Sequence, residues 1–126
     1  LDSDPQALHG HVLERLSALG IAFVHVIEGE TGGERAPASV NPPIDYAALR
    51  ARFKGGWIVN NGYDREMALA AVSLGAADAV AFGRPFIANP DLVARLKANA
   101  PLNEVNRATL YGGGAEGYTD YPALGA

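Results

Sequence analysis

Apolar residues at helical spacing open the chain, and an apolar run follows them. The residues after Asp4-Pro5 that recur at intervals of four, four and three are Leu8, Val12, Leu16 and Leu19. This spacing predicts one face of a helix that ends near Gly20. Residues 21–27 then form a run rich in β-branched and aromatic side chains without polar alternation, which predicts a strand buried on both faces of a parallel sheet.

The same order of segments recurs along the chain. Residues 45–53, 64–74 and 89–97 have the spacing of helices, whose predicted caps are Asp45, Asp64 and Asn89, with Pro90 in the first turn of the last helix. Short apolar segments at 57–59 and 78–82 predict strands, each followed by a turn. Units of about thirty residues in the order strand, loop and helix predict an α/β fold with a parallel sheet and right-handed crossovers.

Three predicted strands are too few to close a barrel. A (β/α)8 barrel takes about 250 residues, and this chain has 126. An open three-stranded sheet would leave two unpaired edges beside apolar strands, which favours pairing with another segment. We therefore predict that a further segment, attached or separate, supplies the remaining strands and covers a face that holds Val24, Ile58 and Val80.

Composition narrows the classes of function. A chain that is 48% hydrophobic at this length supports one compact core. The net charge of −4 has no runs, which argues against nucleic-acid binding. No apolar stretch approaches the roughly 20 residues of a membrane span, and the chain does not start as a signal peptide does, so a cytoplasmic protein is predicted. Because cysteine is absent, redox chemistry would need a cofactor; no metal site is predicted.

Two successive strands end in turns that contain glycine, Asn61-Gly62 and Gly83-Arg84. In a barrel both turns lie at the C-terminal mouth, where loops after the seventh and eighth strands form a phosphate site. Glycine lets main-chain N–H groups approach an anion, and Arg84 is suited to bind phosphate oxygens bidentately. The alternative interpretation is that the glycines only make turns and Arg84 is a solvated surface charge. Spacing alone does not say which phosphate binds.

Three longer stretches resemble the C-terminal third of Old Yellow Enzyme family ene-reductases of the bacterial xenobiotic-reductase type. They are residues 60–64, 81–92 and 111–122, and residues 25–29 are similar to the family's sixth strand. The resemblance implies that residues 1–126 are the C-terminal part of a TIM (β/α)8 barrel, comprising strands six to eight, that binds FMN without a covalent bond. It also implies that residues 28–43 form an active-site loop and residues 111–126 a C-terminal tail.

The resemblance assigns roles to individual residues. The family's phosphate contacts correspond to Asn60, Asn61, Gly62, Gly83 and Arg84. Tyr111 corresponds to a tyrosine that reaches over the flavin toward substrate. The family residues that protonate and hold the substrate match nothing in this chain, so no catalytic residue is predicted here.

The implied activity is that of an FMN-dependent ene-reductase. NAD(P)H reduces the flavin, and the flavin reduces an activated alkene such as an enone, enal or maleimide, with nitro compounds as a further class. The implied partner is the N-terminal half of the same barrel, without which the chain is inactive. Two alternatives stay open: a non-catalytic half-barrel that binds a phosphate or flavin ligand or only self-associates, and another phosphate-binding barrel such as a sugar-phosphate isomerase. The second alternative does not explain the sequence of residues 111–122.

Overall fold

The computed structural model describes residues 3–29, 43–111 and 114–125. These fall into two compact units, residues 1–81 and 82–126. Of the predicted active-site loop at 28–43, residues 30–42 lie outside the described residues, so its structure stays a prediction.

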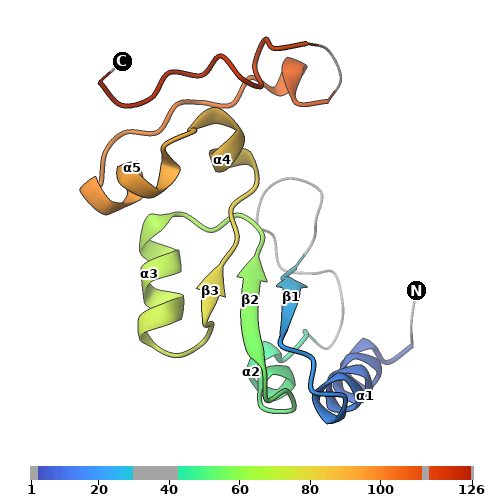
Figure 1. Cartoon of the computed structure of the whole chain (residues 1–126). Helices are drawn as coiled ribbons and strands as arrows, with labels where there is room; N and C mark the ends of the chain where they lie inside the picture. Colours follow the sequence, from blue (N-terminus) through green and yellow to red (C-terminus); the bar gives the residue numbers. More distant parts are fainter. Residues whose placement is uncertain (1–2, 30–42, 112–113, 126) are drawn as a thin grey trace. The chain divides into compact units, whose positions relative to one another are not determined.

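The first unit is a three-stranded parallel sheet in the order β1-β2-β3 with three helices, as predicted (Figure 1). Asp4 and the predicted caps Asp45 and Asp64 each accept a hydrogen bond from a main-chain N–H three residues further on, at 2.8–2.9 Å. The elements of this unit are α1 (Pro5–Ala18), β1 (Phe23–Ile27), α2 (Tyr46–Arg50), β2 (Gly56–Asn60), α3 (Arg65–Ser73) and β3 (Ala79–Val80).

Within the described part of the chain, one face of this sheet is covered and the other is open. Trp57 on β2 is 1% exposed and packs in a core whose other buried members are Leu13, Leu49, Phe53, Val59 and Ala77. Val24 and Val80 pack against this core, so the prediction that they lie on the uncovered face was wrong.

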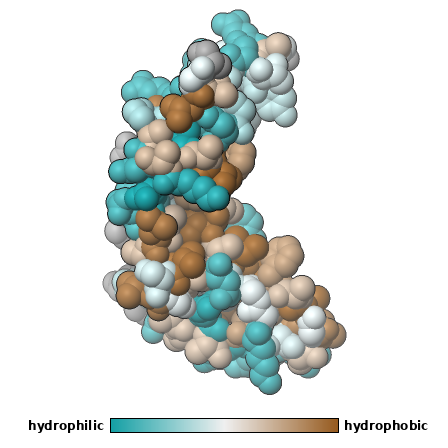
Figure 2. Space-filling model, turned by 60° about the vertical axis from the view of Figure 1, so that its left-hand side comes forward, coloured by the Kyte–Doolittle hydropathy of each residue, from teal (hydrophilic) through white to brown (hydrophobic). Residues whose placement is uncertain are grey.

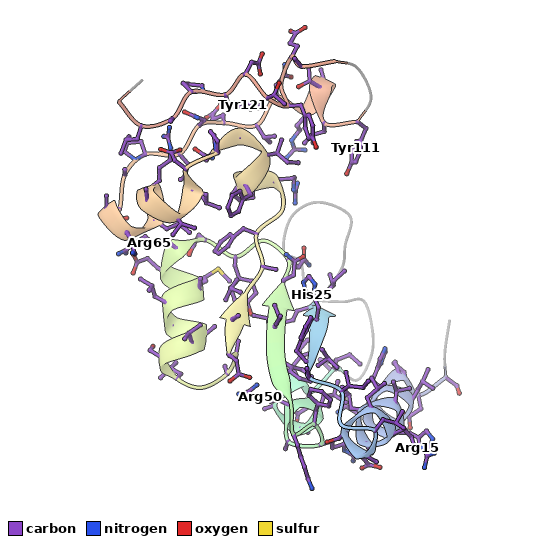
Figure 3. The ribbon with its side chains drawn as sticks, in the orientation of Figure 1. Arg15, His25, Arg50, Arg65, Tyr111 and Tyr121 are labelled. Carbon is purple, nitrogen blue, oxygen red and sulfur yellow. The ribbon has the colours of Figure 1, made fainter. Side chains whose placement is uncertain are left out.

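The open face of the sheet belongs to the alternate residues of β1. Because successive side chains of a strand point to opposite faces, Phe23 and Ile27 point away from the core, and they are 57% and 53% exposed. His25 lies between them, on β1 in Figure 3, and its partner in the register is Ile58. The prediction that β1 is buried on both faces was therefore wrong for this chain. The prediction that Ile58 lies on the open face was correct.

Helix α3 leaves much of its apolar surface exposed. Leu69 and Val72 are about half exposed, Leu74 just beyond the helix is 82% exposed, and no residue of α3 is fully buried. Figure 2, which brings forward the side of the molecule on the left of Figure 1, shows hydrophobic atoms at the surface among hydrophilic ones. The apolar side of this helix is thus only partly packed within the described residues.

Asp78 joins three elements of the first unit. Its Oδ2 accepts a hydrogen bond from the Trp57 main-chain N–H at 2.7 Å, and Arg50 donates to both of its carboxylate oxygens at 3.1 Å. The Arg50 hydrogen bonds, followed by that from Trp57, hold the pKa of the Asp78 carboxyl below its usual range.

Asp78 is expected to make the stability of the first unit depend on acid pH. Its lowered pKa means that the carboxylate stabilises the fold above the unfolded-state pKa of about 4 and loses this effect as the pH falls through the lower folded-state pKa. Asp78→Asn should therefore be less stable than wild type in urea at neutral pH, and the difference should shrink at about pH 3. Glu14→Gln, which removes the exposed partner of Arg52, is the control and should change little. A difference for Asp78→Asn that is equal at both pH values would contradict this role.

The second unit contains two short helices, a 3-10 turn and the tail. These are α4 (Arg84–Ala88), α5 (Leu92–Ala98) and η1 (Arg107–Thr109). Asn89 was predicted as the cap of a helix that begins at Pro90, but α5 begins at Leu92 and its N-cap is Asp91. The Asn89 side chain is instead buried, donating to the Pro85 carbonyl and accepting from the Asn103 N–H.

The described part of the tail is an ordered loop. The Tyr121 hydroxyl accepts a hydrogen bond from the Asn106 N–H at 2.8 Å, and Asp120 accepts one from the Gly117 N–H at 2.7 Å. The tail therefore folds back along its own unit. None of the helices in residues 3–29, 43–111 and 114–125 has the length and apolarity to cross a membrane.

Candidate functional site

The turn after β2 has an unusual backbone. Asn61 and Gly62 both have positive φ, at 102° and 66°, and Asp64 then caps α3. A positive φ is uncommon outside glycine, and asparagine is among the residues that tolerate it best. The Asn-Gly pair therefore permits an abrupt reversal from strand to helix at the carboxyl end of the sheet, which is where the sequence predicts an anion site.

Two asparagine side chains brace this end of the sheet. Asn60 Nδ2 donates to the Ala81 carbonyl at 2.6 Å, just beyond β3, and Asn61 Nδ2 donates to the Glu28 carbonyl, just beyond β1. The main chain adds a Glu28 N–H hydrogen bond to the Asn60 carbonyl at 3.2 Å. The ends of all three strands are thus tied together through the two amides that were predicted to contact phosphate.

This bracing limits what each asparagine offers to a ligand. A side-chain amide has two N–H groups, and in each case the nitrogen already donates to a main-chain carbonyl. Asn61 is also buried. The groups of this turn that remain suited to an anion are therefore chiefly its main-chain N–H groups, and the two side chains hold the turn in place.

Sequence reasoning missed three residues near this turn. The Tyr63 hydroxyl donates to the Glu28 carboxylate, and the Tyr46 hydroxyl accepts from the Gly29 N–H at 2.8 Å. Both contacts fix the chain directly after β1. Glu28 and Tyr63 lie in stretches that resemble the family, but this resemblance did not identify Tyr63 or Tyr46 as a neighbour of residues 28 and 29.

Gly83 and Arg84 begin the second unit's first helix. Gly83 is the N-cap of α4 and makes no side-chain cap, and a Cβ placed there would meet no atom within 4 Å. Arg84 is the first residue of the helix and is half-buried. These two residues belong to the second unit and Asn60, Asn61 and Gly62 to the first, so their convergence on one anion stays a prediction.

The second unit also holds Tyr111 and a groove that was not predicted. Tyr111 is 92% exposed, and Figure 3 shows it on the loop beyond η1. The groove has a volume of about 420 Å³ and lies between α4 and the tail; it is lined by Phe86, Ile87, Pro90, Tyr118, Thr119 and Tyr121. Among the described residues there is no cluster of three or more histidine, aspartate or glutamate side chains placed to hold a metal ion.

Comparison with known proteins gives the chain a family. Residues 8–103 match the NADH:flavin oxidoreductase / NADH oxidase family. The chain is 43% identical over 126 residues to 12-oxophytodienoate reductase 2 of Arabidopsis thaliana, covering 98% of this chain and 33% of that protein. It is 42% identical over 137 residues to 12-oxophytodienoate reductase 7 of Oryza sativa, covering 98% and 34%.

Solved structures agree with the sequence comparison. The old yellow enzyme homologue NCR from Zymomonas mobilis superposes with a TM-score of 0.89 at 40% identity, covering 98% of this chain and 34% of that one. Morphinone reductase superposes with a TM-score of 0.86 at 41% identity, covering 98% and 32%. These neighbours are TIM barrels, and the chain spans about a third of their length and of the length of its curated relatives. The chain therefore belongs to the NADH:flavin oxidoreductase family and, as its sequence predicts, to the Old Yellow Enzyme group within it.

Proposed function

We propose that this chain carries the flavin-phosphate site of an FMN-dependent ene-reductase and acts together with the N-terminal half of the same barrel. The observation that carries the proposal is the Asn61-Gly62 turn, with positive φ at both residues, in a chain whose family is that of flavin oxidoreductases. NAD(P)H is the proposed reductant, which is supported by a structure of the related morphinone reductase in complex with tetrahydroNAD.

The residues of this chain fit the phosphate of FMN. Gly62 and Gly83 offer main-chain N–H groups without a side chain in the way, and Arg84 offers a guanidinium that binds phosphate oxygens bidentately. FMN, when bound, supplies the hydride chemistry. Tyr111 is the proposed substrate-proximal residue, and the substrate is an activated alkene such as an enone, enal or maleimide. No residue of this chain is proposed as catalytic.

The proposed partner is supported by the open sheet face. Phe23 and Ile27 on β1 are more than half exposed, and each would gain about half of the roughly 1.5–3 kcal/mol that burial of a fully exposed apolar side chain contributes. In addition, β1 is an edge strand of the sheet, and no other strand within the described residues pairs with its outer side. A segment that supplies further barrel strands would satisfy both features.

The proposal is tested by reconstitution with the corresponding N-terminal half of a related barrel. The two chains should co-purify with bound flavin and oxidise NAD(P)H in the presence of an enone, whereas this chain alone should do neither. A cooperatively folded monomer of this chain that binds FMN by itself would favour the non-catalytic half-barrel. An assembly that forms but binds no flavin would refute the proposal.

Arg84→Ala is expected to weaken FMN binding in the assembled protein by about 1.5–3 kcal/mol, the range for hydrogen bonds to charged groups. Calorimetric titration with FMN measures this loss. Riboflavin, which lacks the phosphate, should bind the variant and the wild type equally well. Arg107→Ala removes an exposed arginine of η1 and serves as the matched control. An FMN affinity that Arg84→Ala leaves unchanged would remove Arg84 from the phosphate site.

A further inference from the structure

Arg95 on α5 is a buried cation with three well-formed hydrogen bonds. The residue is 4% exposed. Its Nε donates to Asp91 Oδ1 at 2.7 Å, Nη1 to the Pro101 carbonyl at 2.7 Å and Nη2 to the Pro122 carbonyl at 2.9 Å. A buried charge is strongly unfavourable unless it is paired and hydrogen-bonded, and the three acceptors of Arg95 meet this requirement.

The two carbonyls that Arg95 binds lie at opposite ends of one segment, residues 101–122. The guanidinium of Arg95 therefore holds the two ends of this loop together. Its hydrogen bonds offset part of the entropic free-energy cost of closing the loop. Asn103 reinforces the closure because its Nδ2 donates to the carbonyls of Pro122 and Ala88, at 2.9 and 2.8 Å.

The acidic partner of Arg95 also holds the tail. Asp91 binds Arg95 with one carboxylate oxygen and accepts the Leu124 N–H with the other, at 2.7 Å. All these contacts lie within the second unit, and they connect α5 to both sides of the closed loop.

The closed loop carries Tyr111 and part of the groove lining. Tyr111 lies within it, as do Tyr118, Thr119 and Tyr121, which form one wall of the 420 Å³ groove. The opposite wall comes from α4 and the residues after it. The position of this wall relative to α4 therefore depends on how the loop is closed.

We propose that Arg95 is a positioning residue, which closes residues 101–122 and thereby sets the place of Tyr111 and the tail wall of the groove. The part that concerns Tyr111 and substrate rests on the proposed function, whereas the closure and the groove do not. Arginine is required because its planar fork reaches three acceptors at fixed angles, which the single ammonium of lysine does not reproduce.

Hydrogen exchange measured by mass spectrometry on the whole chain tests the closure. In Arg95→Met, exchange in peptides that cover 101–124 should become at least about tenfold faster, as expected from the loss of charged hydrogen bonds. Arg95→Lys should restore part of the protection. Arg52→Met, which breaks the exposed pair with Glu14, is the matched control and should leave the tail as in wild type.

Two results would overturn the inference. One is unchanged exchange of the tail in Arg95→Met. The other is an equal acceleration in α4, α5 and the tail, which would show that Arg95 only stabilises the unit as a whole.

Fluorotyrosine NMR reports directly on the surroundings of the tail tyrosines. The chain has five tyrosines, of which Tyr46 and Tyr63 lie in the first unit and serve as internal controls. Arg95→Met should shift the resonances of Tyr111, Tyr118 and Tyr121 and leave the two controls in place. Unshifted tail resonances would refute the role of Arg95, even if the assembled protein binds FMN. Absence of FMN binding would refute the proposed function and would leave the closure of the loop by Arg95 unaffected.

Discussion

Replacement of Trp57 by alanine is expected to lower the free energy of unfolding of the first unit by about 3–5 kcal/mol, the range for removal of a large buried aromatic side chain. Trp57 is 1% exposed and lies at the centre of the core between the sheet and its helices. A loss of this size is a large fraction of the 5–15 kcal/mol that stabilises a typical domain. Urea unfolding followed by far-ultraviolet circular dichroism measures the change without relying on the tryptophan itself.

Leu74→Ala is the control for this substitution. Leu74 is 82% exposed, so its truncation should stay within about 0.5 kcal/mol of wild type. If Trp57→Ala were no more destabilising than Leu74→Ala, Trp57 would not lie at the centre of the core.

Gly117→Ala is expected to destabilise the second unit by about 2–5 kcal/mol and to release the tail. Gly117 has φ of 68°, and an added Cβ would lie 1.8 Å from Thr109 Oγ1 and 2.5 Å from Thr109 Cβ. The backbone conformation costs a residue with a side chain about 1–2 kcal/mol, and overpacking adds about 1–3 kcal/mol. Hydrogen exchange of residues 114–124 measures the release.

Two further variants separate these contributions. Gly125 also has a positive φ, at 80°, but a Cβ added there would meet no atom within 4 Å. Gly125→Ala should therefore show only the destabilisation that comes from the backbone conformation. Thr109→Ala, combined with Gly117→Ala, should recover part of the overpacking cost. If Gly117→Ala and Gly125→Ala had equal effects, the close approach of Gly117 to Thr109 would be contradicted.

Local signals explain what the sequence predicted correctly. Asp45 and Asp64 act as caps because a short acidic side chain needs only its own backbone neighbours to do so. The parallel sheet follows from the alternation of apolar runs with helical segments. The family was identified from residues 81–92 and 111–122, and the comparisons confirm it.

Contacts distant in sequence explain the failures. Asn89 has the local features of a helix cap, but its side chain accepts a hydrogen bond from the main-chain N–H of Asn103, which lies fourteen residues away. The apolar run of β1 did not reveal that Phe23 and Ile27 would be exposed, because coverage of a strand depends on elements elsewhere. Burial of Arg95 was unpredictable for the same reason, since its acceptors at 101 and 122 come from the tail.

The candidate site was predictable only in part. The glycine-containing turns and Arg84 were visible in the sequence, but the bracing of the strand ends by Asn60 and Asn61 was not, because Ala81 and Glu28 become their neighbours only in the folded sheet. These two amides hold the turn whose main-chain N–H groups are proposed to face the phosphate.

The most direct test of a phosphate site on this chain compares FMN with riboflavin, which differ in the phosphate group. Calorimetric titration of the assembled protein should show FMN binding more than about tenfold more tightly, since one charged hydrogen bond alone contributes about 1.5–3 kcal/mol. This preference should fall in Arg84→Ala. Equal affinities for the two flavins would contradict the proposal that this chain binds the flavin phosphate.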